Sequence, residues 1–375
     1  MIFLKLLEPL GADFVVYYEA AKVFLAGANP YLGLITRTFP FNYPPTALLF
    51  LWPLALFDFA TANIVWNILS TVSVVLSIVL IYELVRLFRP AAPARTATKL
   101  ISLILLFTIF FFPVKFDIGN GQINHFILLF CSLALYLYHH RRKTWSAFFL
   151  AFAIGIKVAP AIFILYFIIR RDWQMVCRVA VTLLILFGIS LLFITPSFQL
   201  VYLRDVLPLS FTTGAKDWYY NQSLWGFLSR SLPSSLSLYL FFPLALLILS
   251  LTWRRGRVLP WRRSLAAVSC LYLLIHPIAL QHYFGFAIIP IILLLSRRDW
   301  KVLASAYLLL AIDIKNFAAV PKEFNFILSH DFYGVLILWT LALWREKILQ
   351  IISAYWVVIV VLIYVLSLAC RAGYC

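Results

Sequence analysis

The sequence predicts an all-α, polytopic integral membrane protein with about ten to twelve transmembrane helices and further helices at the outer membrane surface. Of its 375 residues, 64% are hydrophobic and only 12% are charged, and the mean hydropathy is +0.97. A soluble domain carries about 25% charged residues, so this composition excludes a water-soluble globular protein. Apolar runs that approach the ~20 residues needed to cross hydrocarbon recur from residue 44 to the end.

The distribution of charge is the second observation. The chain has 31 Lys and Arg against 14 Asp and Glu, which gives a formal net charge of +17. Because the basic residues form short clusters between apolar runs, they indicate cytoplasmic loops facing anionic lipid and not a nucleic-acid surface. The segments between these clusters are then expected to face outward: residues 1–43, 114–123, 196–233, 277–282 and 313–331.

Each apolar run is expected to be a helix, because a spanning segment must satisfy its backbone internally and the runs lack the alternation of a barrel strand. The runs are 44–57, 60–85, 100–113, 124–138, 145–169, 175–195, 235–252, 264–278, 283–296, 300–312, 333–344 and 348–369. Two ambiguities follow from the orientation rule. Segments 44–57 and 60–85 cannot both cross fully, and 145–169 is either one span or two half-helices broken around Lys157 and Pro160.

The chain is predicted to form a single integral membrane domain over residues 1–375. We divide it into an outer active-site loop with a juxtamembrane helix (1–43), a core (44–175) and the remaining helices and outer loops (176–375). No internal repeat or cleavable signal peptide is evident. The five cysteines show no metal or redox spacing.

The first outward segment is predicted to hold a helix at the membrane surface. Asp13, Tyr17 and Ala20 fall on one face of it by helical spacing. Asp13 is either the N-cap of this helix or a functional carboxylate. Tyr43 precedes two prolines that begin the next helix.

A second polar group occupies residues 116–126, where Gln122, Asn124 and His125 follow a glycine-rich turn. Amide and imidazole groups suit the hydroxyls of a sugar. The alternative is a helix entry held by interhelical hydrogen bonds.

The remaining polar or aromatic features are a lysine inside an apolar run, a turn with two histidines and an aromatic segment. Lys157 is a lone cation within an apolar run, which favours a phosphate or carboxylate partner over snorkelling to the interface. His276, Gln281 and His282 lie at an outward turn, where either a structural or a functional role is open. Residues 216–228 are rich in aromatic side chains, which indicate an interfacial belt in the first place and a sugar-stacking surface only in the second.

Several chemistries are absent from the sequence. There is no glycine loop for phosphates, no metal-ligand spacing of His or Cys, and no nucleophile-elbow motif. The first outer loop also lacks the DxD pair that holds a metal and a sugar nucleotide. We therefore predict no metal site, no cofactor and no metal-bound nucleotide donor.

Six motifs, in this order and at these distances, resemble glycosyltransferase family 87 of the GT-C superfamily, which includes polyprenyl-phosphate-mannose-dependent mannosyltransferases. They are DFVVYYEAAKVFLAGANPY, FNYPPTALLFLWPLALF, GNGQINHFILLFCSLALYLY, AFAIGIKVAPAIFILYFIIRRDW, YNQSLWGFLSR and QHYFGFAIIP. The similarity extends from residue 11 to about 175, continues motif by motif from 219 to 296, and is limited to apolar helices from 300 to 375.

The resemblance implies a glycosyltransferase that moves a hexose, mannose above others, from a polyprenyl-phosphate donor to a lipid-linked or surface glycan. The reaction would be inverting and metal-independent, at the outer face of the plasma membrane. Asp13 matches the family's first-loop carboxylate, the expected general base, and Lys157 and His282 match positions near the donor phosphate. The expected substrate-binding residues are Tyr17, Tyr43, Gln122, Asn124, His125, Asn221 and Gln281.

One departure concerns the start of the chain. Family members have a full membrane helix before the aspartate loop, whereas residues 1–12 are too short to span the bilayer. Either the recorded start is internal to the gene or the protein does without that helix. A transporter or flippase of polyprenyl-phosphate lipids is the alternative function, and a non-catalytic scaffold is a third.

Overall fold

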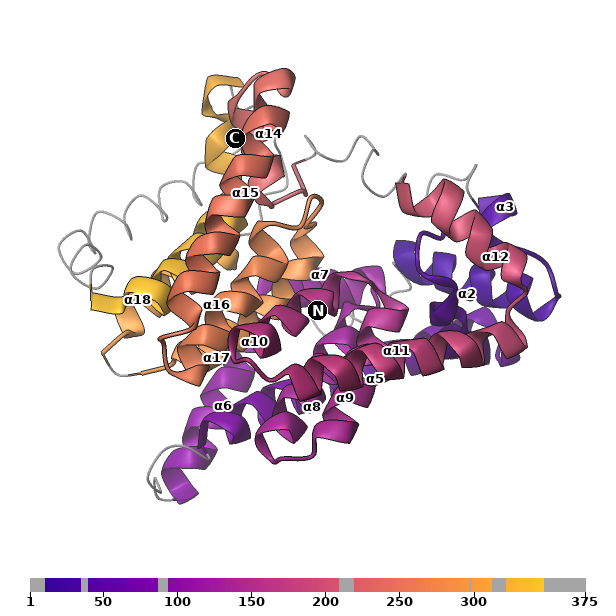
Figure 1. The fold of residues 1–375 in the computed structure, drawn as a ribbon, viewed down its shortest axis with the longest axis horizontal. Coiled ribbons are helices and arrows are strands. Elements are labelled where there is room, and N and C mark those ends of the chain that lie inside the picture. Colours follow the sequence, from indigo (N-terminus) through magenta and orange to yellow (C-terminus); the bar gives the residue numbers. More distant parts are fainter. Residues whose placement is uncertain are drawn as a thin grey trace. The chain divides into compact units, whose positions relative to one another are not determined.

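The structure is a computed structural model that describes residues 11–34, 40–86, 94–208, 219–296, 298–311 and 322–346. In these ranges the regular elements are all helices, and β-pairing is limited to an isolated bridge between Asn221 and Leu280 (Figure 1). The all-α prediction is therefore confirmed. The apolar run at 348–369 lies outside the described residues.

The chain divides into two compact units, which are described separately. Unit 1 comprises residues 1–84 and 116–213, and unit 2 comprises residues 85–115 and 214–375. Helices that begin or end in unit 1 are α2 (Ala12–Leu25), α3 (Pro30–Leu34), η1 (Pro45–Ala47), α4 (Leu48–Leu51), η2 (Trp52–Leu56), α5 (Phe59–Arg86), α7 (Phe112–Asn120), α8 (Asn124–His139), α9 (Lys143–Ile156), η3 (Ala159–Phe163), α10 (Ile164–Ile169), α11 (Trp173–Phe193), α12 (Pro196–Val201) and η4 (Tyr202–Val206).

Two basic turns connect the long helices of unit 1. After α8 the backbone of Arg141 is left-handed (φ 61°), and after α10 that of Arg171 is too (φ 56°). Each turn has the paired backbone hydrogen bonds of a Schellman motif, for example from Arg142 N to Leu137 O at 2.9 Å. Asp172 then caps α11 by accepting from Met175 N at 3.1 Å, and its other oxygen lies 2.7 Å from Lys143 Nζ. Thus α8 and α9 form a hairpin with its charged turn at one end.

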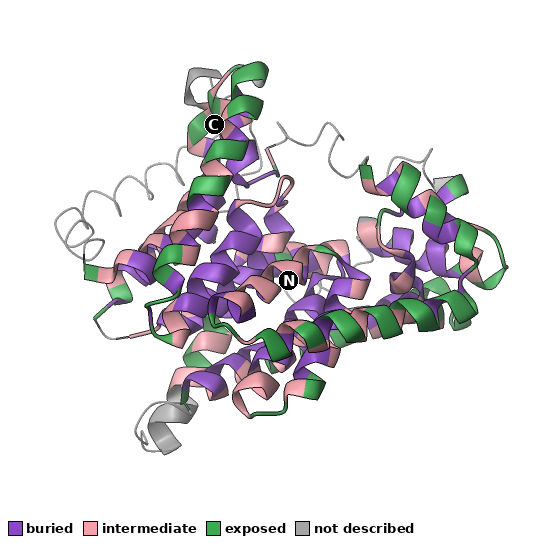
Figure 2. Ribbon diagram, in the orientation of Figure 1, coloured by how far each residue is buried: buried purple, intermediate pink, exposed green. Residues whose placement is uncertain are grey.

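The described elements of unit 2 are helices, one of which is largely buried. They are α6 (Ala94–Ile109), α14 (Leu224–Ser231), α15 (Ser234–Gly256), α16 (Trp261–Leu274), η6 (Gln281–Ala287), α17 (Ile288–Leu294), α18 (Trp300–Leu310), η7 (Lys322–Leu328) and a helix at 330–346. All residues of α16 from Ser264 onward are buried, and α15, α17 and η6 pack against it. Figure 2 shows the contrast with α11, which is exposed along most of its length.

That exposed surface is apolar, as expected of a helix surrounded by lipid. On α11, Leu184 is 70% exposed and Leu192 79% exposed. Three described helices are long and apolar enough to cross a membrane: α5, α11 and α15. The bent pair formed by α6 and α7, with an angle of 59° between them, adds a fourth if it counts as one span. The protein is therefore membrane-embedded.

The number of long spans among the described residues is smaller than the number of apolar runs, because turns and prolines divide those runs. Segment 145–169 is broken at Lys157, where the backbone is extended (φ −148°, ψ 126°) between α9 and η3. This is the half-helix alternative predicted for that segment. Segment 44–57 likewise forms a short apolar helical stretch, Pro45–Leu56.

Candidate active site

Asp13 lies in the first turn of α2 and does not cap it. The helix begins at Ala12, and its N-cap residue is Gly11, with no side-chain hydrogen bond to the free backbone N–H groups. The N-cap interpretation of Asp13 is therefore wrong. A carboxylate in the first helical turn is still favoured by the helix dipole.

The start of α2 is fixed against the turn between α7 and α8. Gly121 in this turn has a positive φ of +66°, and a Cβ added there would lie 2.6 Å from Phe14 Cβ. Trp66 of α5 donates a hydrogen bond from Nε1 to Gly121 O at 2.8 Å, and its ring packs near Phe14. Only glycine permits both the backbone conformation and this close approach. Asp13, next to Phe14, is thereby held at the same turn.

Tyr17, Tyr43 and Gln122 form a hydrogen-bonded group beside Asp13. The two tyrosine hydroxyls are 2.7 Å apart, and Gln122 Oε1 accepts from Tyr17 at 2.9 Å and from Tyr43 at 3.4 Å. The same glutamine side chain hydrogen-bonds Asp13. With its oxygen facing the tyrosines, its amide nitrogen is the donor to the carboxylate.

The environment of Asp13 suits a general base. Burial raises its pKa from 3.8 to about 6; the Gln122 hydrogen bond lowers the pKa, the charge of Asp117 raises it and that of Lys157 lowers it. The side chain stays partly exposed, so a substrate hydroxyl has access to it. A carboxylate with this pKa is mostly ionised at pH 7 and is still basic enough to accept a proton in a transition state.

Lys157 belongs to the same group of side chains. The break between α9 and η3 places it in unit 1, where it is 8% exposed. Its Nζ donates to Asn124 Oδ1 at 2.7 Å and lies 5.8 Å from the centre of the Tyr43 ring. We refer to these side chains together as the aspartate cluster: Asp13, Tyr17, Tyr43, Asp117, Gln122, Asn124, His125 and Lys157.

Asn124 and His125 both contact Asp117, which the sequence did not single out as a site residue. Asn124 Nδ2 donates to Asp117 Oδ1 at 2.8 Å, and His125 Nε2 lies 2.9 Å from Oδ2. All three side chains are buried. The available signal was the acidic residue inside the 116–126 motif, seven positions before Asn124.

The other three predicted site residues, Asn221, Gln281 and His282, belong to unit 2. Asn221 is fully buried, and its Oδ1 accepts from Ser223 N at 3.2 Å and from Ala279 N at 3.1 Å. Its Nδ2 donates to Pro277 O at 3.1 Å. These bonds hold the 277–281 turn against the segment that begins α14.

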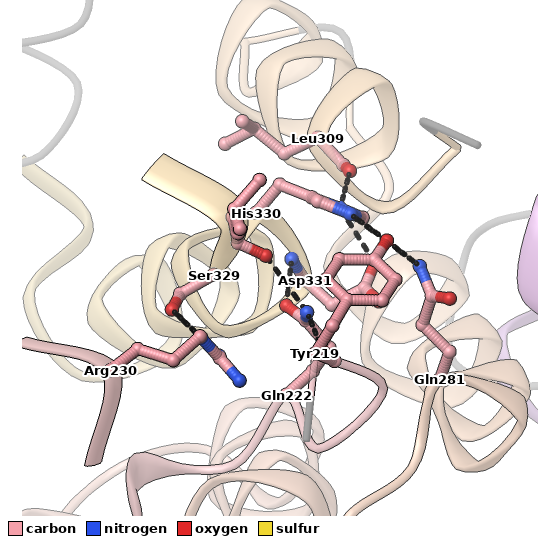
Figure 3. Close-up of polar contacts among 9 residues, drawn as sticks. Tyr219, Gln222, Arg230, Gln281, Leu309, Ser329, His330 and Asp331 are labelled. Carbon is pink, nitrogen blue, oxygen red and sulfur yellow. Dashed lines mark hydrogen bonds and ion pairs between the residues drawn. The ribbon is translucent and has the colours of Figure 1, made fainter. Parts of the chain in front are cut away.

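Neighbouring polar side chains extend this arrangement (Figure 3). Gln222 donates to Tyr219 O and to Leu328 O, both at 2.8 Å, and accepts from Asp331 N at 3.2 Å. Gln281 Nε2 donates to the Tyr219 hydroxyl at 3.1 Å, and that hydroxyl is 3.2 Å from His330 Nε2. We call this the Asn221 cluster: Tyr219, Asn221, Gln222, Arg230, Gln281, Ser329, His330 and Asp331.

His282 follows Gln281 in η6 and is 5% exposed, with its ring 4.9 Å from that of Tyr283. The unit 2 residues Gln222, His330 and Asp331 were also not predicted from the sequence. They lie in outward segments whose polar residues had no recognisable spacing. Among the described residues, no group of three or more His, Cys, Asp or Glu side chains is arranged to hold a metal ion.

Comparison with known proteins matches the model of glycosyltransferase family 87 to residues 41–277. A polyprenol-phosphate-mannose-dependent alpha-(1-2)-phosphatidylinositol mannoside mannosyltransferase of Mycobacterium tuberculosis is 26% identical over 317 residues, covering 78% of this chain and 72% of the relative. A polyprenol-phosphate-mannose-dependent alpha-(1-2)-phosphatidylinositol pentamannoside mannosyltransferase of Mycolicibacterium smegmatis is 26% identical over 322 residues. The match covers 81% of this chain and 74% of the relative. No solved structure matches significantly.

Proposed function

Because the chain belongs to glycosyltransferase family 87, we propose that it transfers mannose from polyprenyl-phosphate mannose to a hydroxyl of a glycolipid acceptor. The names of the two relatives support this donor and this class of acceptor. Membership of the family makes the protein a membrane glycosyltransferase. The alternative drawn from the sequence, a flippase of polyprenyl-phosphate lipids, is not favoured.

The reaction is assigned to the outer face of the plasma membrane. The α8–α9 hairpin supports this side, because α8 begins at Asn124 in the aspartate cluster and its other end meets the basic turn at 141–143. A helix of 16 residues is about 24 Å long, so the two ends are separated by most of the hydrocarbon thickness. Basic turns face the cytoplasm, which leaves the aspartate cluster on the opposite side.

Asp13 is the proposed general base, and its position in the aspartate cluster is the observation that carries the function. Its carboxylate accepts the proton of the acceptor hydroxyl while that oxygen forms a bond to the anomeric carbon of mannose. The bond from this carbon to the phosphate oxygen breaks, and polyprenyl phosphate leaves with the electron pair. A single carboxylate acting in one displacement gives inversion of configuration, by analogy with glycoside hydrolysis.

Lys157 is proposed to stabilise the negative charge on the leaving phosphate. An ammonium group held close to the base allows departure without a metal ion. The phosphate-binding role expected of His282 and the substrate contacts expected of Asn221 and Gln281 stay predictions from the resemblance.

The test measures transfer of radiolabelled mannose from polyprenyl-phosphate mannose to phosphatidylinositol mannosides, by purified protein in nanodiscs with EDTA. Wild type should form a mannosylated lipid, and Asp13→Asn should lower the rate by about 10²- to 10⁴-fold, the usual contribution of a general base. Glu19→Gln is the matched control, because it neutralises another carboxyl group on α2 and should retain activity. An Asp13→Asn protein with near-normal turnover would remove Asp13 from the mechanism.

A further inference from the structure

Asp117 is a buried carboxylate of the aspartate cluster. It is 3% exposed and sits in α7, one turn before the helix ends at Asn120. The first turn of α8 lies against both of its oxygens: Oδ1 accepts a hydrogen bond from Asn124 Nδ2 at 2.8 Å, and Oδ2 lies 2.9 Å from His125 Nε2, a contact without hydrogen-bond geometry. A buried carboxylate that is hydrogen-bonded on one oxygen and packed against a second side chain on the other has little freedom to move.

The Asn124 amide connects Asp117 to Lys157. Its nitrogen donates to Asp117, and its oxygen accepts from Lys157 Nζ at 2.7 Å. A carboxylate only accepts hydrogen bonds and an ammonium only donates them, so the amide has one satisfactory orientation. Asp117 therefore favours the orientation in which the Asn124 amide oxygen faces the Lys157 ammonium.

An amide between the two charges has a chemical consequence. Because an amide is neutral, it holds the ammonium without cancelling its charge, whereas a carboxylate in direct contact would form an ion pair. The low exposure of all three side chains, between 2% and 8%, strengthens these hydrogen bonds.

The backbone that places Asp117 also places Asp13. Gln122 N donates to Asp117 O at 3.0 Å, which closes the turn after α7 and brings Asn124 back to Asp117. This is the turn whose Gly121 contacts Phe14. The general base and the cation are thus positioned by one short segment, residues 117–125.

We propose that Asp117 is a positioning residue for transfer, which orients the Asn124 amide so that the Lys157 ammonium is held for the phosphate of the polyprenyl donor. His125 supports it by contacting the second carboxylate oxygen. Asp117 touches no reacting atom. The inference rests on the proposed function and adds to it the means by which Lys157 is held.

The test is a double-mutant cycle between Asp117→Asn and Lys157→Gln, with two readouts: kcat/KM for polyprenyl-phosphate mannose, and the Kd for polyprenyl phosphate in nanodiscs. In the wild-type background, Asp117→Asn should lower kcat/KM and weaken phosphate binding by about 10- to 100-fold. In the Lys157→Gln background the same change should have an effect below about threefold on both readouts, since the ammonium it positions is gone. Equal losses in the two backgrounds would overturn the proposal.

Two further variants keep the cycle informative. Asp117→Glu retains the carboxylate and should fold even if Asp117→Asn does not. It should lower kcat/KM less than Asp117→Asn, and this loss should disappear in the Lys157→Gln background. A loss of kcat/KM that persists in that background would overturn the proposal. Ser146→Ala is the matched control, because it removes a buried hydrogen bond between α9 and α8, from Ser146 Oγ to Ala134 O. It should change both readouts less than about twofold in either background. If Ser146→Ala lowered kcat/KM as much as Asp117→Asn, and by the same factor with and without Lys157, both effects would be assigned to folding and the proposal would be overturned.

Failure of the proposed function gives a different result. If wild-type protein binds polyprenyl phosphate but transfers no mannose, the proposed function fails, while the binding cycle still decides the role of Asp117. Binding that depends on Asp117 only when Lys157 is present would support the positioning role without transfer. Binding that is indifferent to Asp117 would overturn it.

Discussion

The two buried polar clusters of the protein use the same residue types in different ways. In the aspartate cluster, side chains bond mainly to other side chains, as in the series from Asp117 through Asn124 to Lys157. In the Asn221 cluster, the amides of Asn221 and Gln222 bond to backbone groups of two segments that are distant in the chain, 277–279 and 328–331.

This difference separates side chains that position ionisable groups from side chains that join segments of the chain. An amide that satisfies buried backbone groups removes the cost of leaving them unpaired, and it joins segments of chain that have no strand or helix to pair them. Side chains that bond one another instead fix the positions and charges of ionisable groups. Of the two clusters, the aspartate cluster is the one that combines a partly exposed carboxylate, Asp13, with a buried cation, Lys157.

Among the variants that distinguish the two clusters, Lys157→Gln is expected to have the largest effect. Loss of the ammonium should lower kcat/KM for the donor by about 10²- to 10³-fold, because the charge of the leaving phosphate would no longer be stabilised. Lys143→Gln is the matched control, since Lys143 begins the same helix α9 at its other end, beside Asp172. Steady-state kinetics with the labelled donor would measure both. If Lys157→Gln and Lys143→Gln lowered kcat/KM equally, the loss would be assigned to folding and not to stabilisation of the phosphate.

The next effect is a pH dependence set by Asp13. The ionised carboxylate is the active form, and its pKa is about 6, so kcat/KM should rise with pH and level off above 7. From pH 7 to pH 5 the rate should fall about tenfold, because the ionised fraction falls by that factor. The phosphodiester of the donor stays ionised over this range and adds no step of its own.

Two variants should shift the fall in activity at low pH in opposite directions. The charge of Asp117 raises the pKa of Asp13 and that of Lys157 lowers it. The residual activity of Asp117→Asn should therefore fall off at a lower pH than that of wild type, and the activity of Lys157→Gln at a higher pH. A pH profile that is flat between 5 and 7 would exclude Asp13 as the titrating base.

The sequence was sufficient to predict the helical membrane fold and most of the aspartate cluster. Apolar runs in lipid must be helical. The isolated lysine in such a run favoured a phosphate or carboxylate partner, and the structure shows a hydrogen bond from it to the amide oxygen of Asn124. Asp13, Tyr17, Tyr43, Gln122 and Asn124 were each assigned from motifs that the structure brings together in unit 1. The break at Lys157 was one of two alternatives, because an orientation rule based on charge alone cannot choose between one span and two half-helices.

The remaining features depend on tertiary contacts that no local pattern contains. Asp117 resembles any acidic residue near a membrane surface until the turn at Gly121 brings Asn124 and His125 against it. Asn221, which stays a predicted substrate contact, also satisfies backbone groups more than 50 residues away in the chain with its amide, such as Ala279 N. Such pairings are fixed by the fold and have no sequence spacing.

A smaller effect is expected from removing one hydroxyl of the aspartate cluster. Tyr17→Phe deletes the donor to Gln122 Oε1 and should lower kcat/KM by about three- to tenfold, the value of one hydrogen bond. Tyr18→Phe is the matched control on the same helix, because its hydroxyl donates to Phe57 O at 3.0 Å, away from Asp13. That variant should retain activity within about twofold. If the two variants lost equal activity, the position of Gln122 would not depend on Tyr17.

The smallest effect on catalysis is expected from Gln222→Leu in the Asn221 cluster. The substitution keeps the volume but leaves Tyr219 O, Leu328 O and Asp331 N without the amide that bonds them. Burying such groups unpaired costs about 1–3 kcal/mol, so the thermal unfolding midpoint in detergent should fall by several degrees.

Below that temperature, kcat/KM should stay within about threefold of wild type, because these bonds hold segments of unit 2 and no reacting group. A stably folded Gln222→Leu protein with activity reduced a hundredfold would contradict the distinction between the two clusters. It would show that the backbone held by Gln222, with the adjoining 279–282 segment, must be positioned as closely as Lys157.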